Sequence, residues 1–280
     1  LDLIEEVGKA NSNIIFLLSG GAPFRIPRLD NCRAILHGYL GGQAGAEAMA
    51  DVLLGNETPS GKLNETWPEN LEDTPAYNYF PSKERTAEYR ESVYVGYRYY
   101  DTAGVPVRYP FGYGLSYTTF AYSDLTVSKE KVTFTLTNTG KLDGAEVAQL
   151  YVSAPGKDIF RPQKELKGFA KVFLKAGESK VVEIPLDDKA FRYFNVKTNR
   201  WEVEAGEYTL AVAASAAEVK LEGKLTLAGS NAPAPYGDLP HYHAAQVNQV
   251  TDGEFEAILG RPIPDGSWSG LLTENDAICQ

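Results

Sequence analysis

Cysteine and histidine are scarce in this 280-residue chain, which contains two cysteines and three histidines. Cys32 and Cys279 lie far apart in the sequence, so we expect free thiols rather than a disulfide. Free thiols favour a reducing compartment, and we therefore expect a cytoplasmic location, with secretion left open. His241 and His243 have no cysteine or third histidine nearby, so we expect neither a metal site nor a cofactor.

Long apolar runs and an excess of positive charge are also absent. No apolar stretch reaches the length of a transmembrane helix, and none has the form of a signal peptide. The 27 lysines and arginines are outnumbered by 37 aspartates and glutamates, which gives a net charge of -10. This charge argues against nucleic acids and membranes as partners and suits a neutral partner such as a sugar.

The first 120 residues predict an α/β domain in which helices alternate with strands. Short apolar runs bounded by glycine are typical of buried parallel strands. The expected elements are a helix over 1–10, strands over 14–18 and 33–37, a helix over 45–54 capped by Gly55, and an edge strand over 62–67. Because the chain opens inside a helix, we expect it to start within a domain and to be the C-terminal part of a longer protein.

Residues 121–228 predict an all-β domain. Val132, Phe134 and Leu136 alternate with polar residues, as in a half-buried strand. Further strands are expected over 147–152, 166–173, 181–186 and 208–212, and such short strands separated by turns indicate a sandwich. The aromatic and leucine side chains expected in or beside its core are Phe134, Leu150, Tyr151, Phe169, Trp201 and Tyr208.

Residues 229–280 predict a linker followed by a short, truncated helical tail. The linker contains proline, glycine and asparagine. Thr251 and Glu254 have the spacing of a capping box, which predicts a helix start, and Gly260 predicts its end.

An aromatic segment at 94–120 joins the two domains, with the sequence YVGYRYYDTAGVPVRYPFGYGLSYTTF. Aromatic rings supply flat apolar faces, and the interspersed glycines allow sharp turns around them. Residues 68–91 before it show no apolar period. We therefore expect residues 77–117 to form a long, mostly irregular arm that covers the junction between the two domains.

This segment and several others resemble glycoside hydrolase family 3 of the β-glucosidase type. The other similar stretches are GYLGGQAGAEAMADVLL, GNETPSGKLNETW, NTGKLDGAEVAQLY, RPQKELKGFAKVFLKAGES and WEVEAGEYTLAVAAS. They follow one another in the order of the family. The resemblance implies a bacterial protein with the end of an α/β sandwich domain over 1–120 and a fibronectin type III-like β-sandwich over 121–228.

The family resemblance also implies the chemistry. Retaining glycosidases use two carboxyl groups, a nucleophile and an acid/base. In the family the nucleophile is an aspartate of a preceding barrel domain, and in this branch the acid/base is a glutamate shortly before the helix that opens this chain. Neither motif occurs in the sequence, so we expect no catalytic residue here. We expect the C-terminal portion of an enzyme that hydrolyses β-linked glucosides, or alternatively a non-catalytic carbohydrate-binding or structural module.

Three residues near the aromatic segment are candidates for substrate binding. Glu91 has the chemistry to hydrogen-bond a sugar hydroxyl, or alternatively to pair with Arg85, Arg90 or Arg98. Tyr89 and Tyr79 have rings that could stack on a sugar at an outer subsite, or alternatively serve only in packing. We expect the arm around Glu91 to reach toward the preceding barrel domain.

Overall fold

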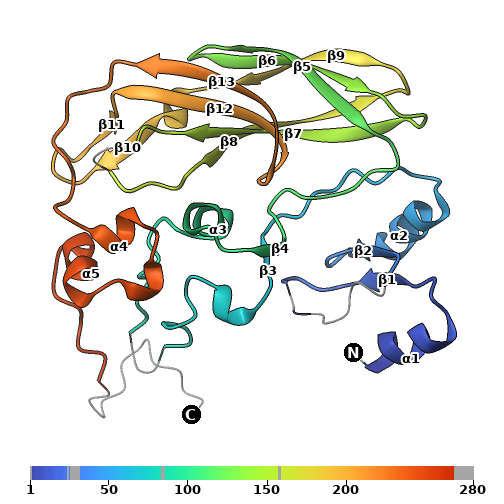
Figure 1. Cartoon of the computed structure of the whole chain (residues 1–280), viewed down its shortest axis with the longest axis horizontal. Helices are drawn as coiled ribbons and strands as arrows, with labels where there is room; N and C mark the ends of the chain where they lie inside the picture. The colour runs from blue at the N-terminus through green and yellow to red at the C-terminus, as the bar shows by residue number, and fades with distance from the viewer. Residues whose placement is uncertain (1, 24, 26–31, 83–85, 157–158, 268–280) are drawn as a thin grey trace.

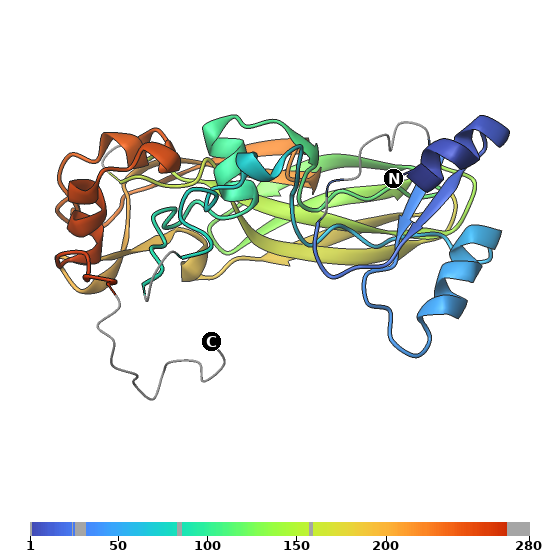
Figure 2. The ribbon, with the colours of Figure 1, turned by 90° about the horizontal axis from the view of Figure 1, so that it is seen from below.

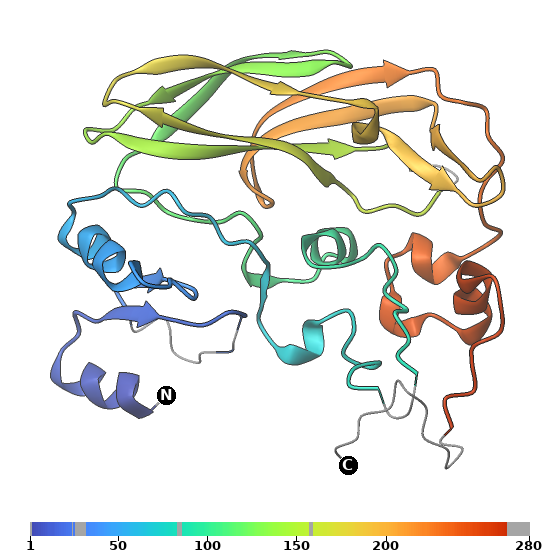
Figure 3. The same cartoon turned by 180° about the vertical axis from the view of Figure 1, so that it is seen from behind.

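The computed structural model describes residues 2–23, 25, 32–82, 86–156 and 159–267. A β-sandwich forms one layer, and the remaining elements lie along one face of it (Figures 1 and 3). Seen from below, the N-terminal helices and the C-terminal helices lie at opposite ends of the molecule (Figure 2). The predicted fold class, an α/β part followed by an all-β sandwich, is confirmed.

The N-terminal α/β unit consists of four elements in the predicted order. They are helix α1 (Asp2–Ala10), strands β1 (Ile15–Leu18) and β2 (Ala34–His37), and helix α2 (Gly45–Leu54). The two strands pair in parallel, with Ile15 opposite Ala34. Helix α2 ends at Gly55, whose φ of 78° is the left-handed conformation that glycine adopts without strain. No described residue of α2 is buried.

The predicted edge strand over 62–67 is wrong. Strand β3 contains only Trp67–Pro68 and pairs with β4 (Val107–Tyr109). Before it, Leu63 forms two backbone hydrogen bonds of the kind found between paired strands. The Leu63 amide donates to the Tyr113 carbonyl, and the Gly112 amide donates to the Leu63 carbonyl. The segment is instead fixed through its lysine, because Lys62 Nζ forms an ion pair of 3.0 Å with the buried Glu146.

The β-sandwich contains two sheets. Their strands are β5 (Phe120–Val127), β6 (Lys131–Asn138), β7 (Gly144–Ser153), β8 (Glu165–Leu174), β9 (Ser179–Pro185), β12 (Gly206–Ser215) and β13 (Glu218–Leu227). One sheet has the order β13-β12-β7-β8 and the other β5-β6-β9. A separate antiparallel hairpin pairs β10 (Arg192–Asn195) with β11 (Arg200–Val203). The predicted domain limits at 121 and 228 remain predictions.

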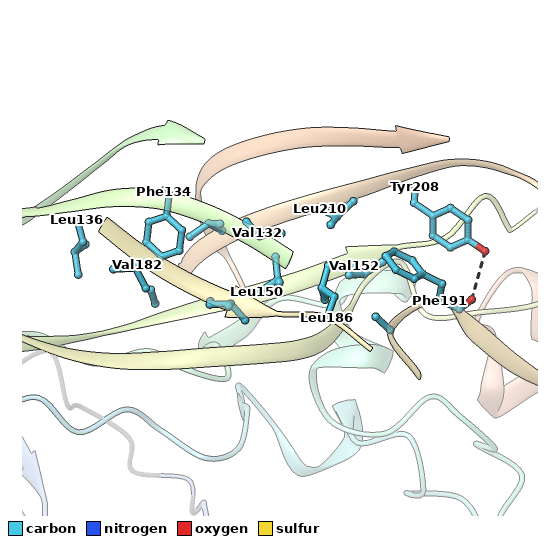
Figure 4. Packing of buried hydrophobic residues seen from close by; sticks show 14 of the residues in the cluster. Val132, Phe134, Leu136, Leu150, Val152, Val182, Leu186, Phe191, Tyr208 and Leu210 are labelled. Carbon is cyan, nitrogen blue, oxygen red and sulfur yellow. Dashed lines mark hydrogen bonds between the residues drawn. The ribbon is translucent and has the colours of Figure 1, made fainter. Parts of the chain in front are cut away.

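The core lies between the two sheets, and the alternation that predicted it is confirmed for β6. Val132, Phe134 and Leu136 are at most 1% exposed and face Leu150 and Leu210 of the other sheet (Figure 4). Tyr208 closes one end of this core, where its hydroxyl donates to the Glu204 carbonyl at 2.9 Å.

Two of the six expected core residues are exposed. Phe169 is 66% exposed because it follows Gly168 onto the outer face of β8, opposite Gln149. Trp201 is 56% exposed because it lies on the β10–β11 hairpin rather than in either main sheet. The prediction that both contribute to the core is therefore wrong, whereas it is confirmed for Phe134, Leu150 and Tyr208. Tyr151 is buried too, but against Tyr97 on the other face of its sheet.

The aromatic segment is more regular than expected. Helix α3 (Tyr97–Ala103) starts after Gly96, with φ 55°, and ends at Gly104, with φ 66°. The tail contains helices α4 (Pro240–His243) and α5 (Asp252–Leu259), with a 3₁₀ turn at Val247–Gln249 between them. Thr251 and Glu254 form the predicted capping box at the start of α5.

No helix in the described part of the chain is both long and apolar enough to cross a membrane.

Candidate functional site

The arm, residues 77–117, is fixed to the four-stranded sheet by aromatic packing. Tyr97 of α3 stacks on Phe111 with ring centroids 4.9 Å apart, and it meets Tyr151 of β7 edge-on at 5.7 Å. The Tyr97 hydroxyl accepts a hydrogen bond of 2.7 Å from the Leu166 amide. Asp101, at the other end of α3, pairs with Lys164 at 2.8 Å. The second half of the arm is therefore a rigid base against the sandwich.

A second aromatic cluster joins the arm to the C-terminal tail. The Tyr94 hydroxyl donates to the Tyr242 carbonyl at 2.6 Å, and both residues are completely buried. Phe160, from the β7–β8 connection, stacks on Tyr242 with centroids 5.1 Å apart. The other buried members are Tyr99, Tyr100, Leu239, Ala245, Val247, Val250 and Phe255. The tail thus has a core of its own, built together with the arm.

Arg90 lies at the centre of the contact between arm and tail. Its guanidinium donates to the Val250 carbonyl at 3.2 Å and to the Asp252 carboxylate at 2.6 Å. Glu88 pairs with the same guanidinium on the arm. The charged group also lies 5.0 Å from the ring of Tyr79 and 5.1 Å from that of Phe255. These contacts position the residues on both sides of Arg90.

The three predicted site residues have different surroundings. Tyr89 is 73% exposed, so its ring is open to solvent. Tyr79 is half-buried against Arg90, in the packing arrangement. Glu91 is only 8% exposed, yet its Oε2 atom is buried without a hydrogen-bond partner in the described part of the chain. The structure therefore places Tyr79 and Glu91 on the inner side of this segment and Tyr89 on the outside.

The alternative ion pairs of Glu91 are not formed among the described residues. Arg90 pairs with Glu88 and Asp252, and Arg98 pairs with Glu165. Arg85, the third arginine considered, lies outside the described residues. Glu91 is thus a buried carboxylate whose Oε2 atom has no partner in the part of the chain that the structure describes.

The charges near Glu91 act on Tyr242. Burial raises the pKa of the Tyr242 hydroxyl, Arg90 opposes that rise, and the carboxylates of Glu254 and Glu91 add to it. The Tyr242 hydroxyl, like Glu91 Oε2, has no hydrogen-bond partner within the described ranges. Two unsatisfied polar groups of this kind are uncommon in a protein interior.

Glu254 organises the tail. Burial opposes its ionisation, but hydrogen bonds from Thr251 and His241 outweigh this effect and lower the pKa of its carboxyl to about 2. His241 Nδ1 lies 2.7 Å from the carboxylate. His241 therefore contacts a helix-capping carboxylate, and the described residues contain no group of three potential metal ligands.

The sequence interpretation considered Arg90 only as a partner of Glu91 and missed its contact with the tail, together with the roles of Asp252 and Tyr242. Tyr242 and Asp252 belong to the tail, for which the sequence predicted only a linker and a short helix. The capping box at Thr251 fixed the helix start that presents Asp252, but nothing in its spacing indicated the partner 162 positions earlier. Long-range pairs of this kind follow from the packing of the tail on the arm.

Comparison with known proteins gives matches to both parts of the chain. Residues 1–117 match the glycosyl hydrolase family 3 C-terminal domain, and residues 146–216 match the fibronectin type III-like domain. Thermostable beta-glucosidase B of Acetivibrio thermocellus is 45% identical over 228 residues, which are 79% of this chain and 30% of that protein. An exo-alpha-(1->6)-L-arabinopyranosidase of Bifidobacterium longum is 45% identical over an alignment of 299 residues, which covers 97% of this chain and 39% of that protein.

A solved structure agrees with these matches. The family 3 beta-glucosidase of Bifidobacterium adolescentis superimposes with a TM-score of 0.80 at 42% identity, over 91% of this chain and 37% of that one. The chain therefore spans well under half of the relatives it matches. Since its two domains match in the order of the family, the chain belongs to glycoside hydrolase family 3, whose C-terminal α/β domain and fibronectin type III-like domain it carries.

Proposed function

We propose that this chain is the C-terminal portion of a retaining β-glucosidase-type hydrolase that removes terminal β-linked sugars. The observation that carries the proposal is the match to two beta-glucosidases, one at 45% sequence identity over 79% of this chain and the other with a TM-score of 0.80 over 91% of it. The partners in the whole protein are a β-linked glucoside and an N-terminal barrel domain.

The chain's own contribution is binding and orientation. Cleavage with retention needs two carboxyl groups about 5–5.5 Å apart. We assign both to residues outside these 280, as the sequence motifs imply. The arm is the part of the chain with a suitable group for a neighbouring sugar, because the ring of Tyr89 is exposed.

We propose that Tyr89 binds the aglycone side of the substrate and that Glu91, on the inner side of the same segment, braces it. The support is the rigid setting of this segment, since Arg90 between them is tied to Val250 and Asp252. A fixed backbone lets a single ring discriminate between leaving groups at low entropic cost. Tyr79, packed under Arg90, would support the segment from within.

The test is a comparison of variants in the full-length enzyme. Tyr89→Ala and Glu91→Gln are assayed with a series of aryl and alkyl β-glucosides, with Phe169→Ala as the control for an exposed aromatic elsewhere. We expect kcat/KM to fall about tenfold for large aglycones and little for methyl glucoside, a difference of about 1.4 kcal/mol. Unchanged ratios across the series would contradict the binding role and leave only packing.

A second substrate class is favoured by one comparison. The Bifidobacterium longum relative that aligns with 97% of this chain is named for an α-L-arabinopyranoside rather than a β-glucoside. Assays of the full-length enzyme with 4-nitrophenyl β-D-glucopyranoside and 4-nitrophenyl α-L-arabinopyranoside separate the two. If the full-length protein hydrolysed neither substrate, the result would favour the alternative of a non-catalytic carbohydrate-binding or structural module.

We also propose a cytoplasmic location. The support is Cys32, which is half-buried and has no disulfide partner among the described residues. Fractionation of the producing cells tests this, and recovery of the protein from the medium or an extracytoplasmic fraction would contradict it.

A further inference from the structure

An open groove lies at the end of the β-sandwich that carries the β10–β11 hairpin (Figure 1). Its volume is about 550 Å³, within the range of sites for small ligands. The apolar floor consists of Leu186, Phe191, Val203 and Leu227. Leu186 and Phe191 also belong to the sandwich core, near the end that Tyr208 closes (Figure 4).

An exposed aromatic platform adjoins this groove. Trp201 of β11 lies directly opposite Phe194 of β10, and their rings meet edge-on at 5.4 Å. Trp201 is 56% exposed and Phe194 is 44% exposed. The guanidinium of Arg192 lies 4.5 Å from the Trp201 ring and is itself held by Asp188 at 2.6 Å. The indole is therefore fixed in place while much of its surface remains open.

The platform and the groove are continuous. Side chains two apart on a strand share a face, so Trp201 and Val203 of β11 point to the same side of the hairpin. Val203 lines the groove, and so does Asp188, the residue that holds Arg192. One surface thus runs from the exposed indole onto an apolar floor.

The rim of the groove indicates the charge of its ligand. Asp187 and Asp188 are 64% and 73% exposed at the side chain. Lys129, also on the rim, lies 3.7 Å from Glu130. Each of the three carboxylates at the rim is paired with a cation, Glu130 with Lys129, Asp187 with Lys189 and Asp188 with Arg192. The rim therefore has no excess charge and suits a neutral ligand, for whose hydroxyl groups the carboxylates are acceptors.

We propose that this surface is a binding site for a neutral β-linked glucan chain, with one pyranose ring stacked on Trp201 and the next over the groove. Pyranoses with equatorial hydroxyls present faces of C–H groups, which pack on the electron-rich face of an indole. Their hydroxyls meet Asp187 and Asp188 at the rim. The inference does not depend on the catalytic assignment, because every residue in it belongs to the β-sandwich domain.

The test measures binding of cellohexaose to the 280-residue chain by isothermal titration calorimetry. We expect saturable binding to the native chain and a loss of at least about tenfold in affinity for Trp201→Ala. The matched control is Phe169→Ala, which removes another exposed aromatic of the same domain and should bind as the native chain does. Hexagalacturonate, an anionic chain, should bind more weakly than cellohexaose.

Three results would overturn the proposal: no binding of cellohexaose, equal binding by Trp201→Ala, or stronger binding of the anionic chain. If the melting temperature of Trp201→Ala is well below that of Phe169→Ala, the binding test is repeated with Trp201→Phe. Its phenyl ring keeps the contact with Phe194 but has a smaller face, so affinity should fall about twofold to fivefold. Unchanged affinity in Trp201→Phe, or dimers of the native chain that Trp201→Ala abolishes without any sugar binding, would also overturn it.

Discussion

The same kinds of apolar residue are buried in the β-sandwich and largely exposed in the N-terminal α/β unit. In the sandwich, Val132, Leu136 and Leu150 are completely buried. In the α/β unit, Leu3, Ile15 and Leu54 are 74%, 51% and 76% exposed. The sandwich supplies both faces of its own core, whereas the two parallel strands and two helices leave apolar faces open.

The difference shows which part of the chain depends on neighbours. A two-stranded parallel sheet is normally covered on both faces, because its strands are apolar throughout. The open faces of β1 and α2 support the proposal that further segments of a longer protein pack there. The arm and tail form a third region, joined to each other by Arg90 and Tyr94.

The largest effect is expected in the sandwich core. Phe134→Ala removes a side chain that is 1% exposed, and we expect a loss of about 3–5 kcal/mol in the free energy of unfolding. Urea unfolding of the purified chain measures it. Phe169→Ala, on the outer face of β8, serves as the control and should cost less than about 1 kcal/mol. Similar losses for the two variants would contradict the strand register.

A smaller effect is expected where the arm meets the tail. Arg90→Met removes the hydrogen bonds to Val250 and Asp252, and we expect a loss of about 1–3 kcal/mol. Arg98→Met is the matched control and should cost less, because the Arg98 side chain is 37% exposed and its Nε lies 3.5 Å from Glu165. Thermal melting and proteolysis of the tail report both. If Arg90→Met cost no more than the control, Arg90 would not join arm and tail.

The tail should also respond to pH. The pKa of Glu254 falls from an ordinary value of 4.5 to about 2 in the folded chain, so its ionised form stabilises the fold above pH 4.5. That stabilisation is lost as the pH falls toward 2. Glu254→Gln should cost about 1 kcal/mol at pH 6, as for loss of a helix cap, and little at pH 2. Glu222→Gln, on the exposed face of β13, is the control. A pH-independent loss would contradict this assignment.

The smallest effect is expected in the α/β unit. Leu54→Ala truncates a side chain that is already 76% exposed, and we expect a change within about 0.5 kcal/mol in the isolated chain. In the full-length protein the same variant should cost more, because a packed neighbour would lose contacts. Equal effects in the two contexts would remove the argument that something covers α2.

Local sequence pattern predicted the elements in which apolar residues keep to one face or a glycine marks the end. Strand β6 alternates cleanly, and helix α2 ends at a glycine, so both were expected from local pattern. Strand β5 was missed because Ser123 and Asp124, with a φ of 57° at Asp124, interrupt its apolar side. Strand β13 was missed because lysines and glutamates separate its leucines, although their period of two was present.

Exposure could not be predicted from residue type alone. Phe169 and Trp201 have the character of core residues, but their faces are set by the bulge in β8 pairing and by the separate hairpin. The ion pairing of Glu91 depends on which arginines reach it, and of the candidates the structure describes, Arg90 and Arg98 pair elsewhere. Local sequence fixes which residues share a face, while tertiary packing decides which face is covered.

The central proposal is that this chain is part of a glycosidase whose catalytic carboxylates lie outside these 280 residues. Turnover of 4-nitrophenyl β-D-glucopyranoside by the purified 280-residue chain, measured beside the full-length protein, tests this most directly. We expect no turnover by the chain alone and clear turnover by the full-length protein. Activity of the chain that persists after removal of contaminating glycosidases would contradict the account.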